Sequence, residues 1–329
     1  MSIDTLYVEQ AVRAHQRTQD IVKRFGHARV IPIDRFGDVF NAPAQNFRHQ
    51  KSHPALILAH KAGTRILPTP PGYHIGGVHN YYFSHMLNCI YDCRYCFLQG
   101  MYKSANYVVF VNTEDFFNDI GQTTEQHDSD VWFFSGYDCD SLALDPVTGF
   151  VKDCLAWFEA NPRSHLELRT KSTQIRPLLN HTPLKNVVVA YSLSPQPVVA
   201  AEEHGTASLH KRLKALKSLQ QAGWSIGLRF DPLLYAENFE SMYKAFFAQV
   251  FDTLDMSAVH SISIGVFRLP KGFHKKVVRL YPDARVLASP LVEHDGMVSY
   301  ANDVEQHMRD FCMNELLKVV RAEQIFPCS

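Results

Sequence analysis

Three cysteines lie within eight positions of the segment SHMLNCIYDCRYCFLQG, as Cys89, Cys93 and Cys96. Their C-x3-C-x2-C spacing supplies three thiolates, which can bind three irons of a 4Fe-4S cluster and leave the fourth iron without a protein ligand. A bidentate amino acid can chelate that open iron. The methionine end of S-adenosylmethionine (SAM) is such a chelator, and an electron from the cluster then breaks the sulfonium bond to give a deoxyadenosyl radical. The spacing therefore predicts a radical SAM enzyme.

A structural zinc site is the first alternative, with His85 as a possible fourth ligand. Structural zinc needs four protein ligands and usually takes them from paired C-x2-C knuckles. No second C-x2-C pair follows in this sequence. A second alternative is a non-catalytic nucleic-acid-binding or redox-sensing protein that uses the cluster structurally.

Composition narrows the class of protein. The chain has 329 residues, seven cysteines, and 33 basic against 33 acidic side chains. Crowded cysteines in a reducing compartment indicate metal binding or catalysis rather than disulfides. The longest apolar runs, such as 55–59 and 187–191, are much shorter than the roughly 20 residues of a membrane helix. The opening MSIDTLYVEQ lacks the layout of a signal peptide, so we expect a cytoplasmic protein with no membrane contact.

Because the net charge is zero, a nucleic-acid partner would need a local basic patch. Two runs qualify. One comprises His210, Lys211, Arg212, Lys214 and Lys217, and the other comprises Arg268, Lys271, Lys275, Lys276 and Arg279. Either run can equally be the solvated face of a helix.

Strand-like and helix-like patterns alternate from about residue 80 onward. We predict strands at 81–83, 107–111, 131–134, 166–169, 187–192, 226–230 and 262–267, and helices at 113–126, 147–160, 173–179, 208–222 and 238–254. Ser208 can cap the helix at 208–222, and Gly223 follows its last turn. The alternation predicts a largely parallel sheet, either a barrel or a doubly wound sheet. The candidate residues follow strand ends, which favours the barrel.

Several longer segments make the chain resemble the spore photoproduct lyase family of radical SAM DNA-repair enzymes. The resemblance covers about residues 30–290 and rests on PGYHIGGVHNYYFSHMLNCIYDCRYCFLQG, GYDCDS, LRTKS, YSLSP, EEHGTASLHKRLKAL and GLRFDPLLY. It implies a partial (β/α)6 TIM-type barrel of the radical SAM kind with N-terminal and C-terminal helical caps. We expect an N-terminal extension packed on the barrel at 1–79, the core barrel at 80–290, and a C-terminal cap at 291–329 that includes a helix at 301–324.

The resemblance also implies a function and a set of site residues. The function is a carbon–carbon lyase that uses a 4Fe-4S cluster and SAM to reverse a methylene-bridged thymine photoproduct in damaged DNA, with an electron donor such as flavodoxin or ferredoxin. Cys89, Cys93 and Cys96 match the cluster ligands, and Cys139 matches the hydrogen-atom donor. The family's residues around SAM are matched by Ser141, Lys171 and Ser192. Lys171 follows a predicted strand and could pair with the SAM carboxylate.

Two departures from the family pattern bear on the end of the reaction and on the substrate. Family members carry tyrosine on both sides of the third cluster cysteine, whereas this chain has Tyr95 before it and Phe97 after it. Phenylalanine cannot pass a hydrogen atom, so either Tyr95 or Tyr91 substitutes in the radical relay or SAM is consumed. The segment LVEHDGMVSYANDVEQHM also replaces a basic lesion-reading region. The alternative function is a radical SAM enzyme for another substrate, such as a modified nucleoside, peptide or small metabolite.

Overall fold

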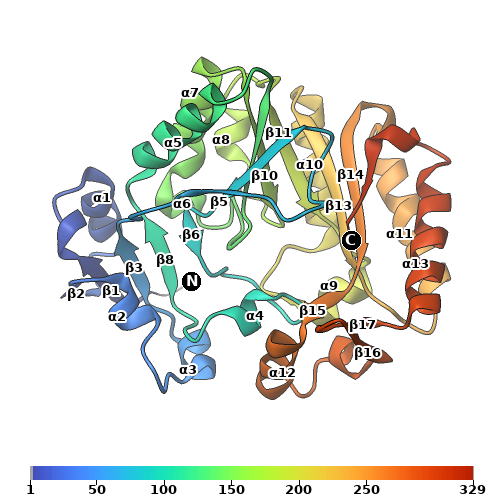
Figure 1. Ribbon diagram of the computed structural model, residues 1–329, viewed down its shortest axis with the longest axis horizontal. Coiled ribbons are helices and arrows are strands. Elements are labelled where there is room, and N and C mark those ends of the chain that lie inside the picture. Colours follow the sequence, from blue (N-terminus) through green and yellow to red (C-terminus); the bar gives the residue numbers. More distant parts are fainter. Residues whose placement is uncertain (1–2, 329) are drawn as a thin grey trace.

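An eight-stranded sheet forms the centre of the computed structural model, which describes residues 3–328. Six of its strands are parallel neighbours that follow one another along the chain: β5 (His79–Phe83), β9 (Val131–Ser135), β10 (Ser164–Thr170), β11 (Val187–Ser192), β13 (Ser225–Leu233) and β14 (Val259–Val266). The sheet curls into a half-barrel that is open on one side (Figure 1). The predicted α/β class with six βα units is confirmed.

Helices cover the convex face of the half-barrel (Figure 1). They are α5 (Thr113–Glu125), α7 (Phe150–Ala160), α8 (Arg176–Leu179), α10 (Leu209–Gln221), α11 (Phe239–Thr253) and α13 (Asn302–Leu316). Alternate strand residues point to opposite faces, so Leu166 and Leu168 of β10 join the apolar core with these helices. The predicted cap of α10 is confirmed, because the Ser208 hydroxyl accepts from the backbone N–H of Lys211 and Gly223 has a φ of 95°.

A second sheet of five strands lies beside the half-barrel, in the order β2 (Arg29–Ile33), β1 (Thr5–Glu9), β3 (Leu56–Ala59), β8 (Tyr107–Phe110) and β6 (Met86–Leu87). Short helices α1 (Gln16–Arg24), α2 (Phe36–Phe40) and α3 (Phe47–Ser52) accompany it. The predicted strand at 107–111 exists, but it pairs here and not among the barrel strands. A buried apolar run is compatible with either sheet, so its own sequence does not choose its partner.

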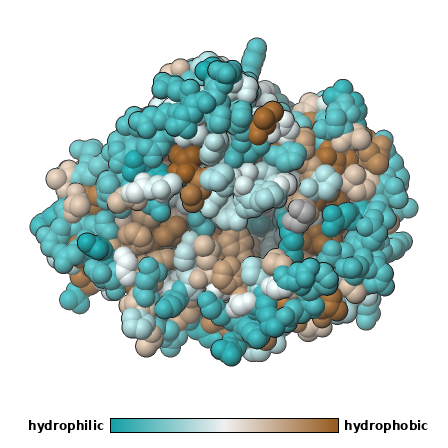
Figure 2. Space-filling view, viewed as in Figure 1, coloured by the Kyte–Doolittle hydropathy of each residue, from teal (hydrophilic) through white to brown (hydrophobic). Residues whose placement is uncertain are grey.

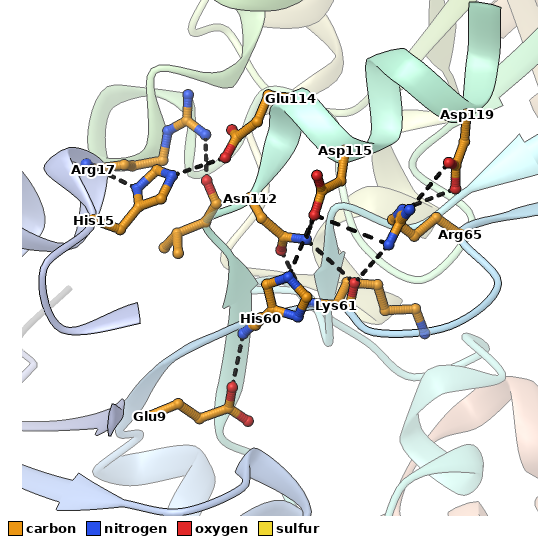
Figure 3. A network of polar contacts seen from close by, with 11 residues as sticks. Glu9, His15, Arg17, His60, Lys61, Arg65, Asn112, Glu114, Asp115 and Asp119 are labelled. Atoms are coloured by element: carbon orange, nitrogen blue, oxygen red, sulfur yellow. Dashed lines mark hydrogen bonds and ion pairs between the residues drawn. The ribbon is translucent and has the colours of Figure 1, made fainter. Parts of the chain in front are cut away.

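A polar network joins this second sheet to helix α5 where β1, β3 and β8 end (Figure 3). The Glu9 carboxylate accepts from the backbone N–H of His60, and the Asn112 amide bonds both the backbone of Lys61 and the Asp115 carboxylate. The hydrogen bond from Asn112 lowers the pKa of Asp115. Arg65 adds a two-pronged ion pair to Asp119 on α5, with distances of 2.8 and 3.0 Å. The network therefore fixes the two sheets relative to each other through α5.

The chain between the two sheets enters the concave side of the half-barrel. Strand β4 (Ile66–Pro68) pairs antiparallel with β5. Tyr73 and Ile75 then pack with Trp132, Phe134 and Val188, whose side chains fill part of the barrel interior. Gly77 lies so close to Trp132 that an added Cβ would be 2.1 Å from the indole Cδ1. The N-terminal segment thus supplies strands and helices, and it also supplies side chains that fill part of the barrel interior.

The C-terminal region differs from the expected cap. After β15 (Arg268–Pro270), α12 (Lys271–Leu280), β16 (Leu291–His294) and β17 (Met297–Tyr300), helix α13 ends at Leu316, so the prediction of a helix to residue 324 was wrong. The chain instead returns to the half-barrel as β18 (Ile325–Pro327), which pairs with β14. Hydrogen bonds from the Gln324 amide to Val259 and from the Cys328 backbone to Ile264 hold it there.

Within residues 3–328, each helix is too short or too polar to cross a lipid bilayer.

Candidate active site

A cavity of about 550 Å³ opens at the ends of the half-barrel strands. The space-filling view shows this face hollowed near its centre, with hydrophobic side chains beside the hollow (Figure 2). The three clustered cysteines line one wall, on the loop between β6 and the short helix α4 (Leu98–Met101). Within that loop, β7 (Asp92–Cys93) pairs antiparallel with β12 (Glu203–His204). The loop is therefore attached to the second sheet through β6 and, through β12, to the segment that precedes helix α10.

The three thiols form a soft donor set that suits iron or zinc. Burial raises the pKa of Cys89 to about 12 and also raises the pKa of Cys93 and Cys96. Within the described residues, no three His, Cys, Asp or Glu side chains converge on a single ion position. A four-iron cluster does not require such convergence, because each thiolate binds a different iron. These residues therefore fit the predicted cluster.

His85, the fourth ligand of the zinc alternative, lies elsewhere. Its ring stacks on Phe150 with the ring centres 3.8 Å apart, and it is absent from the cavity lining. Burial lowers the pKa of His85 to about 3. The side chain is part of the packing beneath α7 rather than of the cysteine loop.

Lys171 and Ser192 line the cavity beside the cysteines. The Lys171 ammonium lies 5.7 Å from the centre of the Tyr95 ring. Burial alone would lower the pKa of Lys171, but the nearby Cys93 and Glu203 outweigh it and raise the pKa. A protonated amine next to three thiols is suited to an anionic ligand group that binds beside the cysteines.

Tyr95 also lines the cavity, but its hydroxyl is already engaged. It donates to the buried Glu203 carboxylate, which also accepts from Ser194 and from Arg212. Burial raises the pKa of Tyr95 well above its usual value. The phenol is thus part of a buried polar network on the wall that carries the cysteines.

Cys139 lies on the loop after β9 and faces the same cavity. It is 7% exposed, and burial raises the pKa of its thiol well above the usual value. The thiol therefore stays protonated at neutral pH. Phe97 lines the cavity as well, and its ring centre is 5.6 Å from that of Tyr137.

Ser141 is the one candidate site residue that the cavity lining omits. Its side chain is buried and shares a 2.6 Å hydrogen bond with the Ser135 hydroxyl, while its backbone N–H donates to the Arg169 carbonyl. An added Cβ on Gly136 would lie 2.6 Å from the Ser141 hydroxyl oxygen. Ser141 is therefore packed behind the turn that contains Gly136.

Sequence reasoning missed a second group of polar side chains that line the cavity. This group comprises Tyr73, Tyr137, Arg169, Asp231 and Cys328. A signal for one of them exists, because Arg169 ends the predicted strand that Lys171 directly follows, and the ends of such strands form the site. Cys328 carries no such signal, since only the pairing of β18 with β14 brings it to the cavity.

Two members of the basic runs, Arg212 and Arg268, are not on a solvated helix face as the sequence suggested. Arg212 has no exposed surface and pairs with Glu203, so it was wrongly grouped with the surface lysines of α10. Arg268 lines the cavity and pairs with Asp231 at 3.1 Å. Lys275 and Arg279 of α12 are exposed.

Comparisons with known proteins agree with this geometry. A family model described as spore photoproduct lyase matches residues 78–290. The spore photoproduct lyases of Bacillus subtilis (strain 168) and Geobacillus sp. (strain Y412MC61) are 23% and 22% identical over 202 residues. The matched segment spans 60% of this chain and 59% of each relative.

Solved structures of spore photoproduct lyase share the fold over nearly the whole chain. A double mutant with bound AdoMet and dinucleoside spore photoproduct has a TM-score of 0.85 at 18% identity, and covers 99% of this chain and 98% of that one. A complex with dinucleoside spore photoproduct has a TM-score of 0.83 over the same shares. The family model alone takes in well over half of the residues, including the three clustered cysteines, Cys139 and Lys171. The chain therefore belongs to the spore photoproduct lyase family.

Proposed function

We propose that this chain is a radical SAM lyase that reverses a methylene-bridged thymine photoproduct, or a related lesion, in DNA. A 4Fe-4S cluster and SAM, when bound, supply the deoxyadenosyl radical that removes a hydrogen atom from the lesion. One observation carries the proposal: three cysteines, a protonated lysine and a separate protonated thiol line one cavity. Relatives whose structures contain AdoMet and the dinucleoside photoproduct support it.

In this proposal each residue has a role that follows from its place. Cys89, Cys93 and Cys96 each hold one iron. Lys171 pairs with the carboxylate of SAM, and Ser192, at the end of β11, hydrogen-bonds the same end of the cofactor. Ser141, whose hydroxyl bonds Ser135, would act on the cofactor only indirectly, by fixing the turn at Gly136.

Cys139 is proposed as the hydrogen-atom donor that ends the repair. After the methylene bridge breaks, a thymine radical remains and must receive a hydrogen atom. A thiol suits this step because its S–H bond is weaker than the C–H bond that forms. Burial keeps the Cys139 thiol protonated, so the hydrogen atom is present when it is needed.

Damaged DNA and an electron donor such as flavodoxin or ferredoxin are the proposed partners, in the cytoplasm. The cavity lies inside the half-barrel, so the linked bases must leave the stack to reach it. Unstacking costs a few kcal/mol, and least for a damaged pair, which itself favours lesions over intact DNA.

The test is anaerobic reconstitution with iron and sulfide, followed by product analysis on a dinucleotide photoproduct with SAM and dithionite. We expect about four irons per chain, SAM cleavage and restored thymines. The Cys93→Ala variant should lose reductive SAM cleavage, whereas Cys154→Ala, a buried cysteine outside the cavity lining, should retain it. SAM cleavage without thymine repair would instead favour the other substrates, such as a modified nucleoside, peptide or small metabolite.

A further inference from the structure

Charged side chains on strand β10 and just after its end lead from the barrel interior to the cavity. Glu167 and Arg169 alternate with Leu166 and Leu168, so both face the concave side. Lys171 follows the end of β10 and also lines the cavity. Glu167 and Arg169 are about 6.6 Å apart along the strand. Lys171 lies beside the cysteines, and Arg169 lies one step deeper.

Glu167 anchors Arg169 from below. The Glu167 carboxylate has no exposed surface and is shared by two guanidinium groups, at 2.7 Å from Arg229 Nη2 and 3.0 Å from Arg169 Nε. Arg229 is also bonded to the carbonyl oxygens of Leu228 and Ser261 and to the Ser261 hydroxyl. Arg229 is therefore fully used by the protein, whereas Arg169 is held through Nε alone.

Arg169 lines the cavity, and its two terminal nitrogens have no hydrogen-bond acceptor among residues 3–328. The guanidinium carbon is 4.9 Å from the centre of the Tyr73 ring. Nearby, Arg268 and Asp231 form an ion pair on the cavity lining. The guanidinium groups of this cluster, on three arginines, are paired with only two carboxylates, so the cluster has a net charge of one positive unit. The arginines are Arg169, Arg229 and Arg268, and the carboxylates are Glu167 and Asp231. A fixed fork of two free N–H donors matches a bidentate oxyanion.

We propose that Arg169 forms an oxyanion subsite, separate from Lys171, and that its ligand is the phosphodiester linking the two nucleosides of the substrate. The identity of this ligand rests on the proposed function. The same chemistry is present in the carboxylate of SAM, which is the other source of an oxyanion in this cavity. A phosphodiester subsite makes the enzyme select a dinucleotide joined through phosphate over a nucleoside that lacks it.

The test compares ligand binding by the reconstituted parent, Arg169→Gln and Arg169→Lys, using calorimetry and equilibrium dialysis. The ligands are thymidylyl-thymidine, thymidine, inorganic phosphate, SAM and decarboxylated SAM. Arg321→Gln is the matched control, because this arginine is 75% exposed and is absent from the cavity lining. Iron content and the thermal midpoint show whether each variant is folded and loaded.

We expect Arg169→Gln to weaken thymidylyl-thymidine binding roughly ten- to a hundredfold, while thymidine and SAM bind as in the parent. Arg169→Lys should recover part of the loss, since it keeps the charge but not the fork. A loss confined to SAM and absent for decarboxylated SAM would support the subsite and assign it to the carboxylate. Equal losses for charged and uncharged ligands, or no loss for any, would overturn it.

If the parent binds inorganic phosphate and SAM but not thymidylyl-thymidine, the proposed DNA substrate is contradicted. The Arg169 subsite is then tested by phosphate binding alone. Phosphate binding should then disappear in Arg169→Gln and persist in Arg321→Gln. Phosphate binding that is unchanged in Arg169→Gln counts against the subsite.

Discussion

Glu167 shows how a single buried carboxylate can organise a cavity. Burial alone would raise its pKa, but the charges of Arg229 and Arg169 outweigh burial and lower the pKa to about 2. Both Glu167 and Arg229 have no exposed surface. Removing one partner from a buried ion pair typically costs about 3–5 kcal/mol, because the other charge is left without compensation.

We therefore expect Glu167→Gln to lower the free energy of unfolding by about 3–5 kcal/mol at pH 7, measured by urea unfolding. A depressed pKa gives stability that is present above the unfolded value of 4.5 and is lost as the pH falls toward about 2. The difference between parent and variant should therefore shrink over this range. Glu159→Gln, at a side chain that is 59% exposed, is the control and should change little at either pH. A pH-independent difference would mean that the charge of Glu167 is not what stabilises the fold.

Phe97 decides how the radical chemistry ends in the proposed function. After Cys139 donates its hydrogen atom, the resulting thiyl radical needs a new one, and a phenylalanine ring has no O–H to give. Phe97 lines the cavity with Cys139, while the Tyr95 hydroxyl is engaged by Glu203. The geometry thus favours consumption of SAM over a relay through Tyr95.

Introducing a phenol at this position should change the stoichiometry of the reaction. We expect the parent to consume close to one SAM per thymine pair repaired, and Phe97→Tyr to consume less. The measurement is the ratio of 5′-deoxyadenosine to repaired thymine under dithionite. Phe97→Leu, which adds no hydroxyl, should keep the parent's ratio. Many repairs per SAM in the parent would contradict the interrupted relay.

At the scale of elements, the segment from residue 70 to 77 is the least expected part of the fold. It places Tyr73 and Ile75 inside the half-barrel and brings Gly77 against Trp132. The close approach, rather than an unusual φ, is what requires glycine at position 77. Trp132 is 9% exposed and packed on Phe134, so the indole has little room to move.

Gly77→Ala should therefore destabilise the protein by about 1–3 kcal/mol, the usual cost of overpacking a filled interior. The matched control is Gly272→Ala in α12, where an added Cβ meets no atom within 4 Å. In a helix that change should be neutral or stabilising by about 0.5–1 kcal/mol. Thermal or urea unfolding of both variants measures the difference in stability between them. Equal stabilities would show that the Trp132 side chain moves to make room for the added methyl group.

Local patterns in the sequence identified most of the elements that hold the site. The strand expected at 187–192 coincides with β11, and the helix predicted at 208–222 differs from α10 by one residue at each end. Both follow from features within the segment, namely a β-branched run and a serine cap before a periodic helix. The cysteine loop was predictable for the same reason, because its ligands are neighbours in sequence.

Features that depend on pairing between distant segments could not be predicted. The 107–110 strand looks the same whether it pairs with β3 or with β9, and only the fold decides. The sequence does not distinguish Arg212 from the surface lysines of α10. In the structure it lies on the helix face that contacts Glu203. Cys328 reaches the cavity only because β18 closes the edge of the sheet next to β14.

For the whole molecule, zero net charge means that DNA affinity must come from a local surface. Helix α12 is the better of the two predicted runs, because Phe273 and the preceding Leu269 and Pro270 line the cavity. Lys271 of this helix is paired with Glu293, and the Lys276 ammonium donates to the Gly100 carbonyl. The side chains left for phosphates are those of Lys275 and Arg279.

We expect the double variant Lys275→Gln, Arg279→Gln to bind duplex DNA more weakly for all sequences and to flatten the salt dependence by about two phosphate contacts. The corresponding change at Lys214 and Lys217 on α10 is the control and should leave the slope of log affinity against log salt unaltered. Titrations between 50 and 200 mM salt, roughly the range over which such contacts are resolved, provide the measurement. A flatter slope for the α10 variant alone would assign the DNA contact to helix α10 instead of helix α12.

The attachment of the cysteine loop has an optical consequence. The chain passes from β5 in the half-barrel to β6 in the second sheet just before Cys89, and β7 ties Cys93 to β12. Release of β6 from the second sheet, or of β7 from β12, would therefore pull the three thiolates apart. Thiolate-to-iron charge transfer gives a reconstituted protein a brown colour. Bleaching of that colour on heating would therefore report the first loss of the β6–β8 or β7–β12 pairing.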